Sequence, residues 1–372
     1  MPIFETPPER LLMGPGPSNA HPSVLAAMSQ PLVGHLDPLF IALLDRLGDG
    51  LRTIFGTSNP MTLPISATGS AGMEAALVNL LEPDDAIVVG VHGVFGGRMA
   101  EVARRAGARV TTVEATWGTA LDADAMAKAI ARIRPKVVSF VHAETSTGVL
   151  QPVEEIASSA REHDALVVLD CVTSLAGLPV ELDRWQVDAA YSGTQKCLSC
   201  PPGLSPVSFS PRAIEVVGAR SVPVQSWFLD LTLLAGYFGG ESRVYHHTAP
   251  ISAIYGLAAG VDRALEEGLP ARFERHARAA ARLVEGLEPL GFEPLVDADE
   301  RLPMLTSVRL PERVRELGDA TVRGRLLKEH GIEVGAGLGP LAGEIWRIGL
   351  MGEIARDEPV DRLLEALRKL LG

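Results

Sequence analysis

Between about residues 60 and 210, short apolar runs rich in β-branched residues alternate with longer amphipathic segments. The segments around 97–106, 122–134 and 153–163 space apolar residues three and four apart, which predicts helices. This alternation is typical of an α/β fold with a mostly parallel sheet and crossover helices. Runs this continuous in apolar residues indicate strands covered on both faces, so we expect the sheet to be buried. The predicted strands are Ala86–Val91, Arg109–Val113, Lys136–Val141 and Ala165–Asp170.

The sequence changes character after about residue 250, where long charged helices such as Pro270–Leu287 alternate with short strands such as Leu305–Leu310 and Ile345–Ile348. This pattern predicts a smaller C-terminal α+β domain. The Pro- and Gly-rich run Met13–Pro17 is unsuited to regular structure and indicates a crossing segment. We therefore expect an N-terminal segment (1–20) that crosses to the active site or to a partner subunit, a large domain (21–255) and a small domain (256–372).

Charge and cysteine content limit the classes of partner and compartment. Lys and Arg number 34 against 46 Asp and Glu, and the net charge of -12 would repel both a nucleic-acid backbone and an anionic membrane surface. No apolar run reaches the roughly 18 to 20 residues of a membrane span. The three cysteines all lie between Cys171 and Cys200, which argues against a secreted disulfide framework. We expect a cytoplasmic protein that binds neither nucleic acid nor membrane.

Three polar groups stand at the ends of predicted strands, where ligands bind in open parallel sheets. Small residues at Thr68–Ser70 precede a helical run, and free backbone amides and hydroxyls there suit a phosphate, although the same residues also form ordinary helix caps. Asp170 ends an apolar strand, where a carboxylate is either paired with a cation or caps the next segment. Lys196 lies in a tight turn of small and polar residues, which suits a lysine that must lose its proton.

Together these groups match the needs of pyridoxal 5'-phosphate (PLP). Lys196 would form a Schiff base with the aldehyde, Asp170 would pair with the protonated ring nitrogen, and the Thr68–Ser70 segment would hold the phosphate.

At these residues the chain resembles the class V, fold type I aminotransferases, and within them the alanine:glyoxylate and serine:glyoxylate aminotransferases. The resemblance covers nearly the whole chain. It implies a fold type I PLP-dependent transferase, in which helices cover a mostly parallel sheet of the seven-stranded type in the large domain. The matching segments are Leu12–Asn19, Thr68–Glu74, His142–Pro152, Asp170, Ser192–Lys196, Pro201–Gly203, Tyr245–Pro250 and Trp346–Gly352.

The resemblance also implies residue roles. Lys196 and Asp170 would be the catalytic pair. Arg347, Gly14 and Thr145 would contact the substrate, and Arg347 would bind the carboxylate of the substrate. Phe95 would stack on the ring where animal relatives carry tryptophan, and Ser70 stands where some relatives have histidine. Tyr245 and Thr248 would reach the phosphate of the neighbouring subunit, so the resemblance implies a homodimer with shared active sites. The expected cofactor-binding residues are Thr68, Gly69, Ser70, Phe95, Thr145, Asp170, Val172, Gln195, Lys196, Tyr245 and Thr248.

The function that this resemblance implies is transfer of an amino group from a small L-amino acid to glyoxylate by a ping-pong mechanism, with alanine or serine as donor. Pyridoxamine:pyruvate transfer is an alternative. A cysteine desulfurase-like lyase is a weaker one, because no cysteine follows Cys200. A PLP-binding regulator without turnover would need a second module, for which the chain has no room.

Three further patterns favour structural roles. Cys197 and Cys200 fit C-x-x-C, but two further zinc ligands are lacking and a redox pair would compete with Lys196 for the same turn. Gly337–Ala342 matches a dinucleotide motif but contains a proline and lacks the following βαβ unit. His246 and His247 are adjacent, so their side chains diverge, and we expect no metal site.

Overall fold

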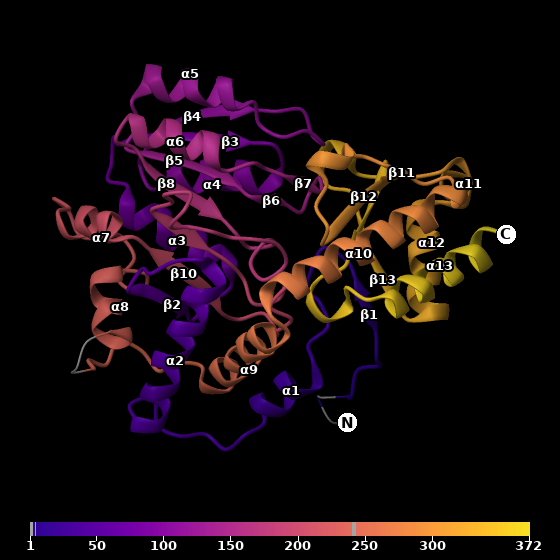
Figure 1. Cartoon of the computed structure of the whole chain (residues 1–372), viewed down its shortest axis with the longest axis horizontal. Helices are drawn as coiled ribbons and strands as arrows, with labels where there is room; N and C mark the ends of the chain where they lie inside the picture. The colour runs from indigo at the N-terminus through magenta and orange to yellow at the C-terminus, as the bar shows by residue number, and fades with distance from the viewer. Residues whose placement is uncertain (1–2, 4, 240–242) are drawn as a thin grey trace.

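The computed structural model describes residue 3, residues 5–239 and residues 243–372 of the 372-residue chain. The described chain contains a seven-stranded sheet, a five-stranded sheet and a two-stranded hairpin. Figure 1 shows the seven-stranded sheet with its helices on one side of the molecule and the five-stranded sheet, built mainly from the C-terminal third, on the other. The predicted α/β fold with a mostly parallel seven-stranded sheet is confirmed.

The seven-stranded sheet has the order β2-β10-β9-β8-β5-β3-β4. Only β10 runs against its neighbours, and β9, β8, β5, β3 and β4 form a continuous parallel set. The strands in chain order are β2 (Met61–Ile65), β3 (Ala86–Val91), β4 (Arg109–Glu114), β5 (Val137–Val141), β8 (Leu166–Asp170), β9 (Ala189–Tyr191) and β10 (Ser205–Phe209).

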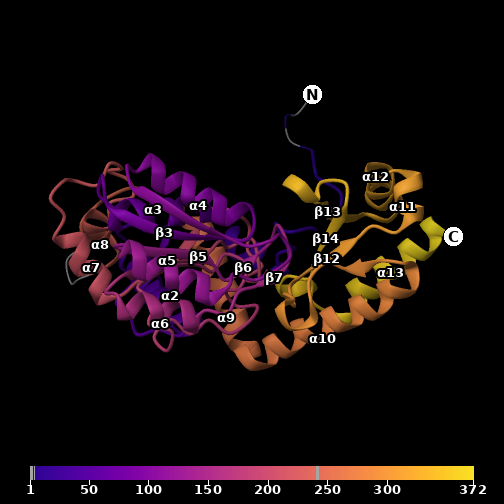
Figure 2. The same cartoon turned by 90° about the horizontal axis from the view of Figure 1, so that it is seen from above.

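Two layers of helices cover this sheet, as the view from above shows (Figure 2). Successive side chains of β5 and β8 alternate between the two cores, as the period of a strand requires: Val138 and Val167 face one layer, and Val137 and Val168 the other. One layer holds α2 (Pro38–Phe55), α5 (Ala123–Ile133), α6 (Glu154–Glu162) and α9 (Ile251–Glu267), with α1 (Pro22–Met28) packed on α9. The other holds α3 (Gly69–Leu80), α4 (Val94–Arg105), α7 (Pro211–Gly218) and α8 (Leu231–Phe238).

The expectation that every predicted strand is covered on both faces is wrong for β4. Its residues are exposed or only partly buried, because β4 lies at the edge of the sheet with β3 as its one neighbour. The polar pair Thr111 and Thr112 in the middle of this strand suits such an edge position.

The five-stranded sheet has the order β1-β13-β14-β12-β11 and is covered by α10, α12 and α13. β1 comes from the N-terminus and pairs in parallel with β13, so the residues after Met13 run from this sheet toward the larger one. Residue 255, the predicted domain boundary, lies within α9, and the division into domains stays a prediction. The elements are β1 (Leu11–Met13), α10 (Leu269–Leu287), β11 (Glu293–Pro294), β12 (Leu305–Arg309), α11 (Glu312–Leu317), α12 (Asp319–His330), β13 (Ile332–Ala336), β14 (Ile345–Gly349) and α13 (Asp357–Leu371).

Short elements connect the two sheets. The hairpin of β6 (Ala143–Glu144) and β7 (Val149–Leu150) follows β5 and bridges to Arg301 of the C-terminal part. Single 3-10 turns, η1 (Glu288–Leu290), η2 (Ala298–Glu300), η3 (Gly339–Leu341) and η4 (Gly352–Ile354), complete the C-terminal part.

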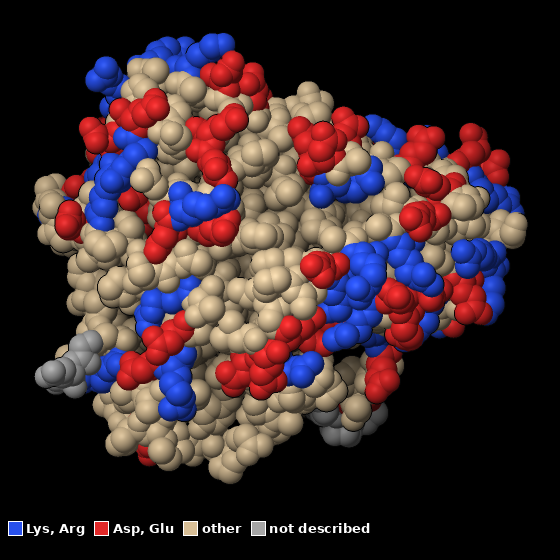
Figure 3. All heavy atoms as spheres, in the orientation of Figure 1, with Lys and Arg blue, Asp and Glu red and all other residues tan. Residues whose placement is uncertain are grey.

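The surface carries charges of both signs. On the face that Figure 3 shows, acidic and basic side chains lie interspersed over both parts of the molecule. None of the helices among the described residues combines the length and the apolar character needed to cross a membrane.

Candidate active site

A cavity of about 280 Å³ lies at the carboxyl ends of β8 and β9, at the edge where polar side chains were predicted to meet. It brings together nine of the predicted residues: Thr68, Gly69, Ser70, Phe95, Thr145, Asp170, Val172, Gln195 and Lys196. Its other lining residues, which were not predicted, are Met73, Arg98, Val141, Ala143, Thr173 and Tyr191.

Asp170 is the buried carboxylate of this cavity. Its Oδ1 accepts a hydrogen bond from the Val172 backbone N–H (2.8 Å), and its Oδ2 accepts one from the Tyr191 hydroxyl (2.8 Å). Burial raises the pKa of Asp170 to about 7, although both hydrogen bonds act to lower it. Neither partner is a cation. A carboxylate buried in this way fits a cationic ligand such as the protonated nitrogen of a pyridine ring, which would compensate its charge.

Tyr191 is a site residue that the sequence reasoning missed. It is fully buried, and burial together with Asp170 raises the pKa of its hydroxyl, so it stays a hydrogen-bond donor. The signal is the parallel register of β8 and β9, which places Tyr191 directly opposite Asp170. Because paired residues of adjacent strands project to the same face, aligning the two strands at their polar ends would have placed Tyr191 beside Asp170.

The buried charge of Asp170 leads to a stability prediction for the PLP-free protein. Between pH of roughly 4 and about 7 the unfolded chain has an ionised Asp170 while the folded chain keeps its proton, so the folded state loses stability as the pH rises through this window. Asp170→Asn removes the ionisation and keeps the shape. We expect the PLP-free variant to melt at least about 2 °C above the PLP-free wild type at pH 8, with the difference shrinking toward pH 4. Equal melting temperatures at pH 8 would contradict a buried, uncompensated Asp170.

Lys196 lies on the loop after β9 and is also buried. Burial lowers its pKa to about 8, opposed by Cys197 and Asp170 and assisted by Arg347, so a useful fraction is unprotonated near neutral pH. Its Nζ donates a hydrogen bond to the Pro15 carbonyl, and its backbone carbonyl accepts one from the Ser18 hydroxyl (2.8 Å). The N-terminal segment therefore reaches the active site of its own chain.

Gly16 shows how closely this segment approaches the lysine. Gly16 has a φ of +107°, and a Cβ there would lie 2.8 to 2.9 Å from three side-chain atoms of Lys196. Both the backbone angle and the space require glycine.

The start of α3 borders the cavity at the segment predicted to bind phosphate. Thr68 is its N-cap residue but makes no side-chain capping bond, and its first turn contains no acidic residue. A Cβ on Gly69 would lie 3.2 Å from Val172 Cγ2 and 3.3 Å from the Ser192 carbonyl, so the absence of a side chain lets the helix start close to the cavity wall. The helix dipole and the backbone amides of the first turn suit a phosphate, and the role of Thr68–Ser70 in binding it stays a prediction.

Phe95 lines the cavity and lies in the first turn of α4. Two side chains with no predicted role bind the backbone of this turn. Glu144 Oε2 accepts a hydrogen bond from the Phe95 N–H (3.2 Å), and Ser146 Oγ accepts one from the Val94 N–H (2.9 Å). Arg98 stacks on the Phe95 ring at 5.0 Å from the centroid. The aromatic ring is thus held in place for stacking against a planar ligand.

Arg347 on β14 faces the same site from the C-terminal part. Its Nε donates to the Ala336 carbonyl (2.8 Å) and its Nη1 to the Thr145 carbonyl (3.1 Å). Burial lowers its pKa to about 10, and it stays cationic at neutral pH. Glu344 and Glu353, two acids close to Arg347 in the sequence, pair with other arginines, Arg315 at 3.2 Å and Arg356 at 3.0 Å.

The remaining predicted residues lie outside the cavity. Tyr245 is 58% exposed and its ring lies 5.2 Å from that of His35, and Thr248 is exposed. The carbonyl oxygen of Gly14 lies against Gly349, two residues after Arg347 in the chain. The expected contribution of Tyr245 and Thr248 to a neighbouring subunit stays a prediction.

The C-x-x-C pair is buried within the lysine loop. Burial raises the pKa of Cys197 to about 11 and that of Cys200 to about 12, so neither thiol is an activated nucleophile.

The chain is similar to known proteins over nearly its whole length. The family described as Aminotransferase class-V matches residues 12–344. An alanine–glyoxylate aminotransferase from Nostoc sp. has a crystal structure with a TM-score of 0.97 and 48% sequence identity, covering 100% of this chain and 97% of that one. The (S)-ureidoglycine–glyoxylate transaminase of Bacillus subtilis is 38% identical over 98% of this chain and 91% of its own. The alanine–glyoxylate aminotransferase of Drosophila melanogaster is 39% identical over 98% and 93%.

Proposed function

Since this chain belongs to the class V aminotransferases and its cofactor is PLP, we propose that it transfers the amino group of L-alanine to glyoxylate, with serine as a second donor. The observation that carries the proposal is that Asp170 and Lys196 line one small cavity, while Arg347 binds the carbonyl of Thr145, another lining residue. Glyoxylate is common to the names of the three relatives, whereas the donors in those names differ.

PLP, when bound, supplies an aldehyde carbon and an electron-withdrawing ring. The start of α3 and Gln195 would bind its phosphate, and Phe95 and Val172 would enclose the ring from its sides. Asp170, oriented by Tyr191, would hold the ring nitrogen in its protonated form, because an anion one hydrogen bond away raises the pKa of a cationic acid.

Lys196 would carry the proton between the substrate Cα and the cofactor, since its amine lies in the same cavity and its lowered pKa suits both giving and accepting a proton. Arg347 would bind the carboxylate that alanine, pyruvate, glycine and glyoxylate share, through two parallel hydrogen bonds. Thr145 links this arginine to the cavity through its carbonyl group. Both half-reactions would use one set of residues, as a ping-pong mechanism needs.

A donor panel tests the substrates. The PLP-loaded enzyme is assayed with L-alanine, L-serine and (S)-ureidoglycine, each with glyoxylate and with pyruvate as acceptor, and kcat/KM is compared. We expect the highest value for alanine with glyoxylate. A value for (S)-ureidoglycine that exceeds alanine by tenfold or more, about 1.4 kcal/mol in transition-state binding, would replace alanine as the donor.

Asp170→Asn should bind PLP but turn over more slowly. An amide cannot stabilise a pyridinium as a carboxylate does, and a hydrogen bond to a charged group contributes about 1.5 to 3 kcal/mol, so kcat should fall roughly tenfold to a hundredfold. Single-turnover rates with alanine, at equal PLP content, provide the measurement. Unchanged rates would remove Asp170 from the mechanism.

We also propose a homodimer in the cytoplasm. Tyr245 and Thr248 are exposed in the single chain, which leaves them free for a neighbouring site, and the three cysteines are buried and unpaired, as suits a reducing compartment.

Thr248→Ala tests the shared site. If Thr248 binds the phosphate of the partner subunit, the variant should lose PLP on dilution while Thr119→Ala, a surface control, keeps it. Sedimentation and PLP absorbance are measured together across a dilution series. A monomer with full activity at assay concentration would refute shared sites.

A further inference from the structure

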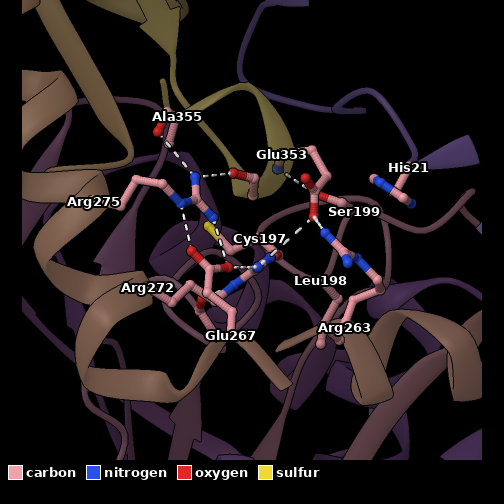
Figure 4. Close-up of polar contacts among 12 residues, drawn as sticks. His21, Cys197, Leu198, Ser199, Arg263, Glu267, Arg272, Arg275, Glu353 and Ala355 are labelled. Carbon is pink, nitrogen blue, oxygen red and sulfur yellow. Dashed lines mark hydrogen bonds and ion pairs between the residues drawn. The ribbon is translucent and has the colours of Figure 1, made fainter. Parts of the chain in front are cut away.

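A group of buried charged side chains lies at the elbow between α9 and α10, outside the cavity described above (Figure 4). α9 ends at Glu267, Gly268 turns the chain with a φ of +81°, and α10 begins at Leu269. Arg272 and Arg275, in the first turns of α10, are 1% and 6% exposed. We call Glu267, Arg272 and Arg275 the elbow cluster.

Within the elbow cluster, Arg272 binds the loop that carries Lys196. Its Nη2 donates to the carbonyl oxygen of Cys197, the residue after the lysine, at 2.6 Å. Its Nε donates to the Ala176 carbonyl at 3.0 Å, and its Nη1 to Glu267 Oε2 at 2.7 Å. All three kinds of guanidinium nitrogen are used, and both backbone acceptors belong to the part of the chain around the seven-stranded sheet.

Arg275 binds the segment that follows Arg347. Its Nη1 donates to the carbonyls of Gly352 (2.8 Å) and Ala355 (2.9 Å), which come directly after β14 in the chain. Its Nε and Nη2 donate to the two oxygens of Glu267 at 2.6 and 2.9 Å. Glu267 therefore joins two arginines that hold opposite sides of the active site.

The two held segments also touch each other. The Ser199 hydroxyl accepts a hydrogen bond from the Glu353 N–H (2.9 Å), and a Cβ on Gly352 would lie 2.8 Å from the Cys197 carbonyl. This close packing brings the two segments into direct contact beside the elbow cluster.

Burying these charges is costly, which makes general stabilisation a poor explanation for the elbow cluster. Burial by itself would raise the pKa of Glu267, but the hydrogen bonds from Arg275 and Arg272 outweigh it and lower the pKa to about 2. Glu267 thus stays ionised, and both arginines stay paired, at every pH at which the enzyme would work.

We propose that Arg272 and Arg275 are positioning residues that share Glu267 as their common anchor: Arg272 places the Lys196 loop, Arg275 places the Arg347 segment, and together they set the separation between the lysine amine and the carboxylate-binding guanidinium. This rests on the proposed function, in which both groups act on one substrate. That separation would suit substrates whose carboxylate is attached directly to the reacting carbon.

The test separates the two arginines by different readouts. Arg272→Lys and Arg275→Lys are compared with Arg282→Lys, a control on the same helix whose partner Asp361 is exposed. The measurements are the PLP dissociation constant, the midpoint pH of the visible absorbance of the PLP-loaded enzyme, and the inhibition constant of propionate, a carboxylate without a reacting group. The inhibition constant of propionate reports directly on the Arg347 side.

Arg275→Lys should raise the inhibition constant of propionate and the KM of alanine and glyoxylate about tenfold, with kcat and PLP affinity unchanged. Arg272→Lys should weaken PLP binding about tenfold and move the absorbance midpoint, with propionate inhibition changed less than about threefold. Arg282→Lys should change none of them.

Parallel changes of both readouts in both arginine variants, or no change in either, would overturn the proposal, since a merely structural cluster predicts one of those results. If a lysine variant fails to fold, Ser199→Ala serves instead: it removes the Glu353 contact and should weaken propionate inhibition, and no effect would again count against the proposal. PLP binding needs no amino donor, and propionate binding can also be followed by its effect on the visible absorbance, so a wild type that binds both but fails to convert alanine contradicts the proposed function and not this inference.

Discussion

Lys196→Ala is expected to abolish transamination, with kcat lowered at least about a thousandfold, because the same amine binds the PLP aldehyde and carries the proton. Among the residues that the structure describes, no other lysine lines the cavity. The variant should also lose the visible absorbance that borohydride reduction removes from the wild type. PLP content, the absorbance spectrum and single-turnover rates with alanine are measured together.

Lys369→Ala, in which an exposed lysine paired with Glu365 is removed, is the matched control and should behave as wild type. A Lys196→Ala protein that keeps both its borohydride-reducible absorbance and its turnover would exclude Lys196 from the mechanism.

Arg347→Lys is expected to lower kcat/KM by about a hundredfold or more for alanine and for glyoxylate alike. A charge-assisted hydrogen bond contributes about 1.5 to 3 kcal/mol, and a lysine ammonium cannot replace the two parallel bonds of a guanidinium. The value of kcat/KM should fall for both substrates, because the carboxylate of each binds the same guanidinium group. The comparison of kcat/KM for the two substrates, with PLP content checked, is the measurement.

The alternative is that Arg347 only ties β14 to the Thr145 carbonyl and that the carboxylate is bound elsewhere. In that case kcat/KM would fall less than about tenfold for both substrates, and thermal stability would fall instead.

The sequence predicts Asp170 and Lys196 at the centre of this site because the rule that places them concerns where strands end and not which side chains touch. Strands of a buried parallel sheet are recognisable as continuous apolar runs, as with β3 and β8, and their carboxyl ends meet at one edge. Asp170 at the end of one run and Lys196 after the next were therefore placed together without any knowledge of side-chain contacts.

What the sequence did not predict depends on contacts between distant segments. Glu144 and Ser146 lie in the predicted site motif, but that they hold the first turn of α4 follows only from the folded hairpin. Arg272 and Arg275 were read as part of a charged helix, although they share a stripe with Ala279 and Leu283, which face the core. Arginine is mostly exposed in proteins, so its residue type assigns these positions to the surface even though helical periodicity places them on the buried face.

The central claim is that one set of residues carries an amino group from a small amino acid to glyoxylate in two separate half-reactions. The PLP-loaded enzyme is mixed with L-alanine alone, and pyruvate and visible absorbance are measured; glyoxylate is then added after alanine has been removed, and glycine is measured. We expect one pyruvate per subunit with loss of the absorbance, followed by one glycine per subunit with its return. Formation of pyruvate only when both substrates are present together, or no glycine from glyoxylate after the alanine step, would contradict the account.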